Sequence, residues 1–108
     1  MIVTTTEKIA GYRTAEVLGE VAGVIVRSRG LGGNIVASLR SLGGGEITEY
    51  TRLLEDTRRQ AIDRMVGNAP ARGANAVTMM RFDSCAAGRT MTEVCAFGTA
   101  VVIESEGF

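Results

Sequence analysis

Residues Glu46–Ala69 read EITEYTRLLEDTRRQAIDRMVGNA and carry the clearest periodicity in the chain. Apolar side chains recur there at helical intervals, and they are Ile47, Tyr50, Leu54, Ala61 and Met65. That spacing gathers them into one stripe along an α-helix. The stretch therefore predicts one long amphipathic helix, and the other elements are placed on either side of it.

The outer face of this helix carries charges of both signs. Three pairs are spaced i, i+4, and they are Arg52–Asp56, Glu55–Arg59 and Arg59–Asp63. Each such pair adds about 0.3 kcal/mol where it is exposed to solvent. We interpret this face as a solvated, salt-bridged surface and not as a binding surface.

The end of the helix is marked by Pro70. Proline lacks a backbone N–H and crowds the preceding helical turn, so the helix is expected to kink or end near Gly67–Ala69. A short turn is expected to resume before Gly73, because glycine commonly occupies the position just past a helix end.

The tail that follows predicts a long β-hairpin. Its strands are expected at about Ala76–Ser84 and Thr92–Glu104, joined by a loop over Ala86–Thr90. Upstream of the helix, Ile2–Thr5 is a short β-prone segment, and Ala15–Arg27 (AEVLGEVAGVIVR) is a valine-rich strand.

Gly19 and Gly23 interrupt the valine-rich strand. Glycine weakens a regular strand, so these positions are expected to mark a bulge, a bend or the close approach of another backbone. The strand is therefore expected to be curved.

Between this strand and the long helix lies a glycine-rich segment. Asn34 is a good N-cap for a short helix over Ile35–Leu42, which Gly43–Gly45 would stop. The preceding Gly30–Gly33 invites comparison with a phosphate cradle, supported by nearby arginines. However, Ile35 stands where a dinucleotide fingerprint needs glycine, and the chain has no lysine in P-loop position. A plain tight turn is the preferred interpretation.

The element order predicts an α+β fold, in which one antiparallel sheet packs against the long helix and the short helix in two layers. The 108 residues and 11.4 kDa fit a single domain, residues 1–108, and 45% hydrophobic with 22% charged residues is a folding composition. Three Phe, two Tyr and no Trp give little aromatic mass for a core. Contacts between subunits are therefore expected to bury the remaining apolar surface.

Composition also excludes several classes of function. Twelve basic and twelve acidic residues leave no net charge, which argues against nucleic-acid and anionic-membrane partners. The absence of histidine excludes Ser/His/Asp triads, Cys/His dyads and His-containing zinc sites. Met1–Glu20 lacks a signal-peptide pattern, and two cysteines are too few for a disulfide framework, so we expect a cytoplasmic protein.

Cys85 and Cys95 are the candidate metal ligands. They flank the hairpin tip, and an even register sum would place both thiols on one face, where Asp83, Glu93 and Met91 could complete a soft-metal site for Cu(I) or zinc. Without a CxxC spacing, the alternative is that both cysteines are structural filler, and this is the preferred interpretation.

Two further groups of residues are candidates for a catalytic or metal site. Asp83, Glu93 and Glu104 are carboxylates near the hairpin that could act as an acid and base pair, although no spacing requires it. Met79–Met80 is interpreted as core or interface filling.

The chain as a whole resembles the YbjQ-like family of small bacterial proteins. The motifs that carry the resemblance are Thr4-Thr5, Gly11-Tyr12, Leu18-Gly19, Val21, Leu42-Gly43-Gly44-Gly45, Glu49-Tyr50, Leu53, Arg58, Ala61, Ala71, Gly73-Ala74-Asn75-Ala76-Val77, Asp83 and Gly98-Thr99-Ala100-Val101. The resemblance implies a subunit similar in fold to dodecin-like subunits, which assembles into a homopentameric ring. The family carries a heavy-metal-binding label and no established reaction.

This chain departs from the family pattern at two places. Pro70 stands where the family helix runs unbroken, so a straight helix is not implied there. Cys85 and Cys95 stand where the family often has a carboxylate or a small polar residue, so the metal label does not transfer to them.

Three functions follow from these observations. The first is a non-catalytic oligomeric binding or scaffold ring, with any ligand site between subunits. The second is a soft-metal or thiol-redox protein that uses Cys85 and Cys95. The third is a small enzyme with a carboxylate-lined cleft between subunits. The first is preferred, because no catalytic motif is present.

Overall fold

The computed structural model of the chain describes residues 1–28, 48–87 and 91–107. Its elements are β1 (Ile2–Val3), β2 (Tyr12–Ser28), α2 (Thr48–Asn68), the 3₁₀ turn η1 (Pro70–Arg72), β3 (Ala76–Ala87) and β4 (Met91–Ser105). The predicted long helix, valine-rich strand and hairpin are thus confirmed. The predicted short helix and the two glycine runs lie outside the described residues.

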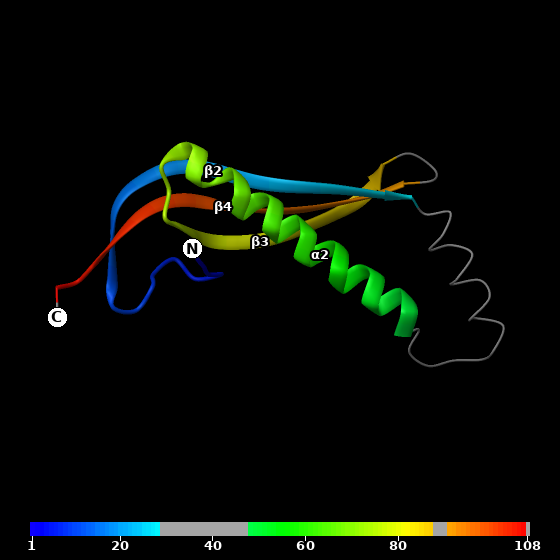
Figure 1. Cartoon of the computed structure of the whole chain (residues 1–108), viewed down its shortest axis with the longest axis horizontal. Helices are drawn as coiled ribbons and strands as arrows, with labels where there is room; N and C mark the ends of the chain where they lie inside the picture. The colour runs from blue at the N-terminus through cyan, green and yellow to red at the C-terminus, as the bar shows by residue number, and fades with distance from the viewer. Residues whose placement is uncertain (29–47, 88–90, 108) are drawn as a thin grey trace.

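The four strands form one sheet in the order β1-β3-β4-β2 (Figure 1). β4 pairs antiparallel with both β2 and β3, but β1 pairs parallel with β3 through Ile2↔Ala76 and Val3↔Val77. The prediction of a purely antiparallel sheet was therefore wrong at this edge, and the sheet is mixed. The whole of β2 and α2 separates β1 from β3, so no hairpin turn forces an antiparallel arrangement.

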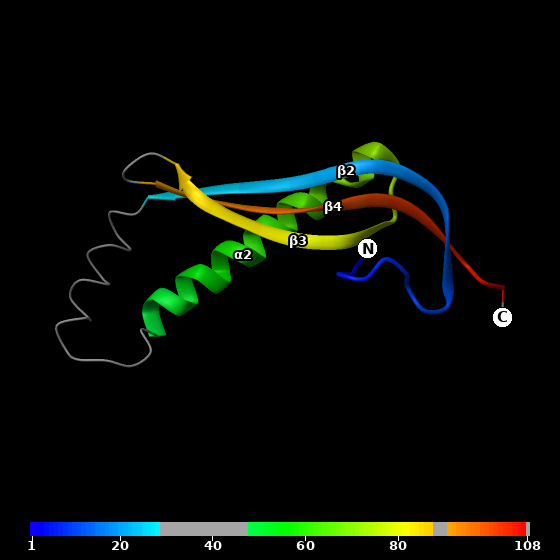
Figure 2. The same ribbon diagram turned by 180° about the vertical axis from the view of Figure 1, so that it is seen from behind.

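α2 crosses one face of the sheet and contacts β2 and β4 (Figures 1 and 2). Ala61 and Met65 of its predicted stripe are completely buried, against a core that includes Val21, Ile25 and Val94. Leu54 remains 40% exposed, because the N-terminal part of the helix diverges from the strands (Figure 1). The apolar stripe is thus confirmed for the C-terminal half of the helix.

The charged outer face of α2 is arranged differently from the prediction. In the described part of the chain the ion pairs are Arg13–Glu104 and Arg27–Asp56, and none of the three predicted i, i+4 pairs is formed. Asp56 instead accepts a hydrogen bond from Nε2 of Gln60 at 2.9 Å, and Oε1 of Gln60 accepts one from Arg27 at 2.6 Å. These contacts connect α2 to the end of β2.

The predicted helix end is confirmed. α2 stops at Asn68, and Pro70 is the first residue of η1, where its missing N–H costs no bond. Gly73 follows with φ +84°, and its N–H donates to the carbonyl of Pro70. This turn reverses the chain from α2 into β3.

The chain has a small core for its length. Its radius of gyration is 17.5 Å, whereas a compact domain of this size has about 13 Å. The largest completely buried side chains are Met65, Val77 and Thr57. Among the described residues, α2 packs on one face of the sheet, and Ile9 packs on part of the opposite face.

Candidate functional site

The sheet face opposite α2, here called the far face, carries the candidate metal ligands. Along β4 the side chains alternate, and Val94 and Ala96 are buried on the helix side. Glu93, Cys95 and Thr99 therefore project from the far face. The strand registers add neighbours to them: Val24 and Val26 from β2, and Asp83 and Cys85 from β3.

The two cysteines share this face, as an even register predicts. Asp83 lies opposite Cys95, and Cys85 lies opposite Glu93, so the thiols occupy diagonal positions of a four-residue square, with the carboxylates on the other diagonal. The Sγ atom of Cys85 donates a hydrogen bond to Oε2 of Glu93 at 3.2 Å. The cysteines are both free thiols.

The surroundings of both thiols raise their pKa values and so favour the protonated form. The hydrogen bond to Glu93 is the main cause that raises the pKa of Cys85. The carboxylate accepts this bond from the S–H group and so stabilises the protonated thiol. Burial is the main cause that raises the pKa of Cys95, and the negative charges of Glu93 and Asp83 add to it. Protonated thiols are weak nucleophiles and weak metal ligands.

The square is not a preformed metal centre. Within residues 1–28, 48–87 and 91–107, no group of three or more Cys, Asp or Glu side chains is arranged to hold a metal ion. The three carboxylates considered from the sequence do not come together. Glu104 lies near the other end of β4, away from Asp83 and Glu93, and forms an ion pair with Arg13. Asp83 accepts a hydrogen bond from the N–H of Ser84.

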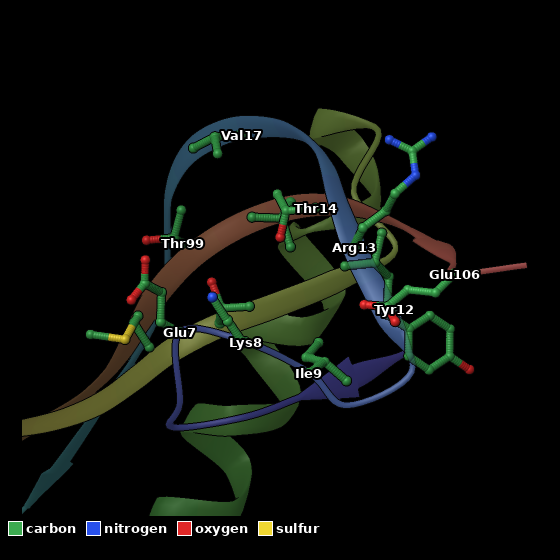
Figure 3. A pocket seen from close by; sticks show the side chains of 13 residues that line it. Glu7, Lys8, Ile9, Tyr12, Arg13, Thr14, Val17, Thr99 and Glu106 are labelled. Atoms are coloured by element: carbon green, nitrogen blue, oxygen red, sulfur yellow. The ribbon is translucent and has the colours of Figure 1, made fainter.

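A second feature of the far face is a pocket of about 520 Å³, here called the loop pocket. It lies between the loop of residues 4–11 and the curled ends of β2, β3 and β4 (Figure 3). Ile9 from the loop packs on Ala76, Val101 and Ile103, which form a small second core. The lining residues are Glu7, Lys8, Ile9, Tyr12, Arg13, Thr14, Val17, Thr78, Met79, Thr99, Val101, Ile103 and Glu106.

A β-bulge shapes one wall of the loop pocket. Met79 and Met80 together face the single residue Gly98, and Met79 has φ +57°, a left-handed conformation that is uncommon for a residue with a side chain. The N–H of Met79 donates to the carbonyl of Thr6 at 3.2 Å, and that of Met80 to the carbonyl of Thr4 at 3.0 Å. The loop thus holds the bulge in place.

The bulge separates the roles of the two methionines. Met80 packs against the main core, as filling residues do, whereas Met79 is 41% exposed and lines the loop pocket. Sequence reasoning missed this pocket, because its walls come from four separate segments. Gly98 is a local signal of the bulge, because a glycine inside a strand often marks a bulge or the close approach of another backbone.

A family profile described as "Putative heavy-metal-binding" matches residues 1–104, which is nearly the whole chain. The chain belongs to the YbjQ family. One YbjQ-family relative, the UPF0145 protein BRADO6695 of Bradyrhizobium sp. (strain ORS 278), is 62% identical over 104 residues, covering 96% of this chain and 94% of the relative.

YbjQ-family relatives are not restricted to bacteria. The UPF0145 protein SSO1976 of the archaeon Saccharolobus solfataricus is 57% identical over 104 residues, covering 96% of this chain and 91% of the relative. The name UPF0145 states no activity, so the relatives extend the family and leave its chemistry open.

The fold is also found in a solved structure. A protein of unknown function from Pediococcus pentosaceus superimposes with a TM-score of 0.62, covering 96% of this chain and 98% of that one. The two sequences are 14% identical, so this likeness shows the fold alone. In the described part of this chain, no helix combines the length and apolarity needed to cross a membrane.

Proposed function

We propose that the chain is the subunit of a homo-oligomeric, non-catalytic binding protein that buries the hairpin end of its far face against further copies of itself. The observation that carries the proposal is an apolar patch at the hairpin end of that face. Its members are Val24, Val26 and Met91, which are 37%, 52% and 43% exposed. Three exposed large apolar side chains on an uncovered sheet face favour a partner surface.

The shape of the subunit supports the same proposal. A radius of gyration well above that of a compact domain leaves the chain with a small core, and a second copy would supply the missing layer. Val24 and Val26 are already partly buried, so each would gain part of the about 1.5 to 3 kcal/mol that full burial of an exposed valine contributes. An interface of several such residues is therefore favourable.

The finer features of the assembly come from the family resemblance. It supports a ring of five dodecin-like subunits with any ligand site between them, because identical head-to-tail contacts close a ring when the rotation divides a full turn. The two free cysteines support a reducing compartment, and the cytoplasm is the one we propose.

Light scattering coupled to size exclusion tests the assembly. The parent protein should have a mass several times 11.4 kDa across a dilution series. Val26→Glu should reduce that mass, because it places a charge in the apolar patch, while Arg59→Glu on the exposed surface of α2 should leave it unchanged. Circular dichroism checks that both variants are folded. A monomeric parent would overturn the proposal.

The second candidate function is soft-metal binding at the square of Cys85, Glu93, Cys95 and Asp83. Two thiols and two carboxylates on one face favour it, together with the family's description. Metal binding requires thiolates, and both thiol pKa values are raised, so uptake must release protons and strengthen as pH rises. A neighbouring copy on the far face would add a second set of ligands.

Cadmium titration followed by metal analysis tests this candidate. The parent should retain cadmium in a fixed ratio to chains, more tightly at pH values closer to the thiol pKa, and the Cys85→Ser/Cys95→Ser double variant should retain none. Ser84→Ala, which leaves all four side chains of the square in place, is the matched control. Equal cadmium retention by the parent and the double variant would show that the cysteines are structural.

A further inference from the structure

We infer that the loop pocket binds a zwitterionic α-amino acid with an aliphatic side chain. The pocket is formed within one chain and lies at the opposite end of the far face from the apolar patch of Val24, Val26 and Met91. The inference therefore goes beyond the proposed assembly. The volume of the loop pocket, about 520 Å³, falls within the range of small-molecule sites.

The first evidence is a hydroxyl on the pocket wall that makes no hydrogen bond to the described residues. Thr78 is only 5% exposed, and within the described residues its hydroxyl makes no hydrogen bond. Thr99 lies directly opposite it across the strand pair and also lines the pocket. The two hydroxyls are therefore available to hydrogen-bond a polar group of a ligand in the pocket.

The second evidence is the pair of opposite charges on the loop. Glu7 and Lys8 both line the pocket, and neither belongs to an ion pair of the described residues. The other lining cation, Arg13, is occupied by Glu104. A simple anion would be repelled by Glu7 and a simple cation by Lys8, whereas a zwitterion presents its ammonium to the first and its carboxylate to the second.

Figure 3 shows how these groups are distributed. Glu7, Lys8 and Thr99 lie toward one end of the pocket, under Val17, and Tyr12 and Glu106 lie toward the other. The ammonium and carboxylate of the ligand are therefore assigned to the first end.

The third evidence is an apolar wall next to these polar groups. Val17 is 66% exposed and Met79 is 41% exposed, and both line the pocket. Met79 is placed there by its left-handed backbone conformation, a kind of strain that tends to occur at ligand sites. The aliphatic side chain of the ligand would pack against Val17 and Met79.

Isothermal titration calorimetry with L-leucine tests the inference. Leucine should bind saturably, one per chain, and N-acetyl-L-leucine and L-leucinamide, which each lack one charge, should bind about tenfold more weakly. Lys8→Gln should weaken leucine about tenfold but should not weaken leucinamide, because leucinamide has no carboxylate for Lys8 to hold and its ammonium loses a repelling like charge. Asp63→Asn on the exposed surface of α2 is the control and should bind like the parent.

Thr78→Val separates a ligand contact from a structural role. The change removes an unpartnered hydroxyl, so the melting temperature of the ligand-free protein should stay the same or rise, while leucine affinity falls. A lowered melting temperature with unchanged affinity would overturn this role of Thr78.

No saturable heat with leucine, or equal affinity for all three ligands, would overturn the inference. Light scattering on the same samples keeps it separate from the proposed assembly. An oligomer that does not bind leucine refutes the pocket alone, and a monomer that binds leucine refutes the assembly alone.

Discussion

Gly23→Ala is expected to lower the free energy of unfolding by about 3 kcal/mol or more, because overpacking a core against rigid atoms is strongly destabilising. A Cβ at this position would lie 2.3 Å from the carbonyl O of Ala61 and 2.3 Å from the N of Met65. Both atoms belong to the backbone of α2, which cannot move aside as a side chain can. The helix must therefore withdraw from β2.

Urea denaturation followed by circular dichroism measures this effect. Gly67→Ala is the matched control, since a Cβ at Gly67 meets nothing within 4 Å and the residue is exposed near the end of α2. Alanine should stabilise that position by about 0.4 to 1 kcal/mol through its helix preference and a less disordered unfolded chain. Similar decreases in the free energy of unfolding for Gly23→Ala and Gly67→Ala would contradict the close approach of α2 to β2.

Asn75→Ala is expected to lower the free energy of unfolding by about 2 kcal/mol, the cost of two lost hydrogen bonds that leave a backbone pair unsatisfied. The side-chain amide of Asn75 donates from Nδ2 to the carbonyl of Ile103 at 2.9 Å. Its Oδ1 accepts from the N–H of Ile103 at 2.7 Å. Asn75 thus acts as an extra strand residue ahead of β3, next to the loop pocket.

Asn68→Ala is the control for this prediction. Asn68 also bonds to a strand, but through one bond, from Nδ2 to the carbonyl of Ala22 at 2.8 Å, at an exposed position. The loss of this one hydrogen bond should lower the free energy of unfolding by about 0.5 to 1 kcal/mol. Thermal melts of the two variants should therefore differ, and equal losses would show that the Asn75 pair adds nothing.

Local chemistry in the sequence determined most of the secondary structure. The helix predicted over Glu46–Ala69 is observed as Thr48–Asn68, and Pro70 and Gly73 mark the turn where they were expected. Gly19 lies at a bulge with φ +101°, and Gly23 lies where another backbone comes close. These features could be predicted because they depend on local effects. Proline and glycine change the backbone conformation at or next to their own position, and the spacing of apolar residues reports a helix within a few turns.

The close approach at Gly23 and Gly98 is nevertheless made within one chain. Gly23 faces the backbone of α2, and a Cβ at Gly98 would lie 2.9 Å from the carbonyl of Thr78. The sequence indicated that Gly23 marks a bulge, a bend or the close approach of another backbone, and this backbone belongs to the same chain. Which backbone these glycines meet depends on how the helix and the strands pack.

Tertiary structure alone decided the arrangement of the candidate sites. The far-face square depends on the pairing of Cys85 with Glu93 and of Asp83 with Cys95, and the loop pocket depends on a loop from the N-terminus that reaches β3 and β4. The parallel pairing of β1 is decided in the same way. Contacts between segments far apart in the chain are set by strand register and loop closure, which no local spacing encodes.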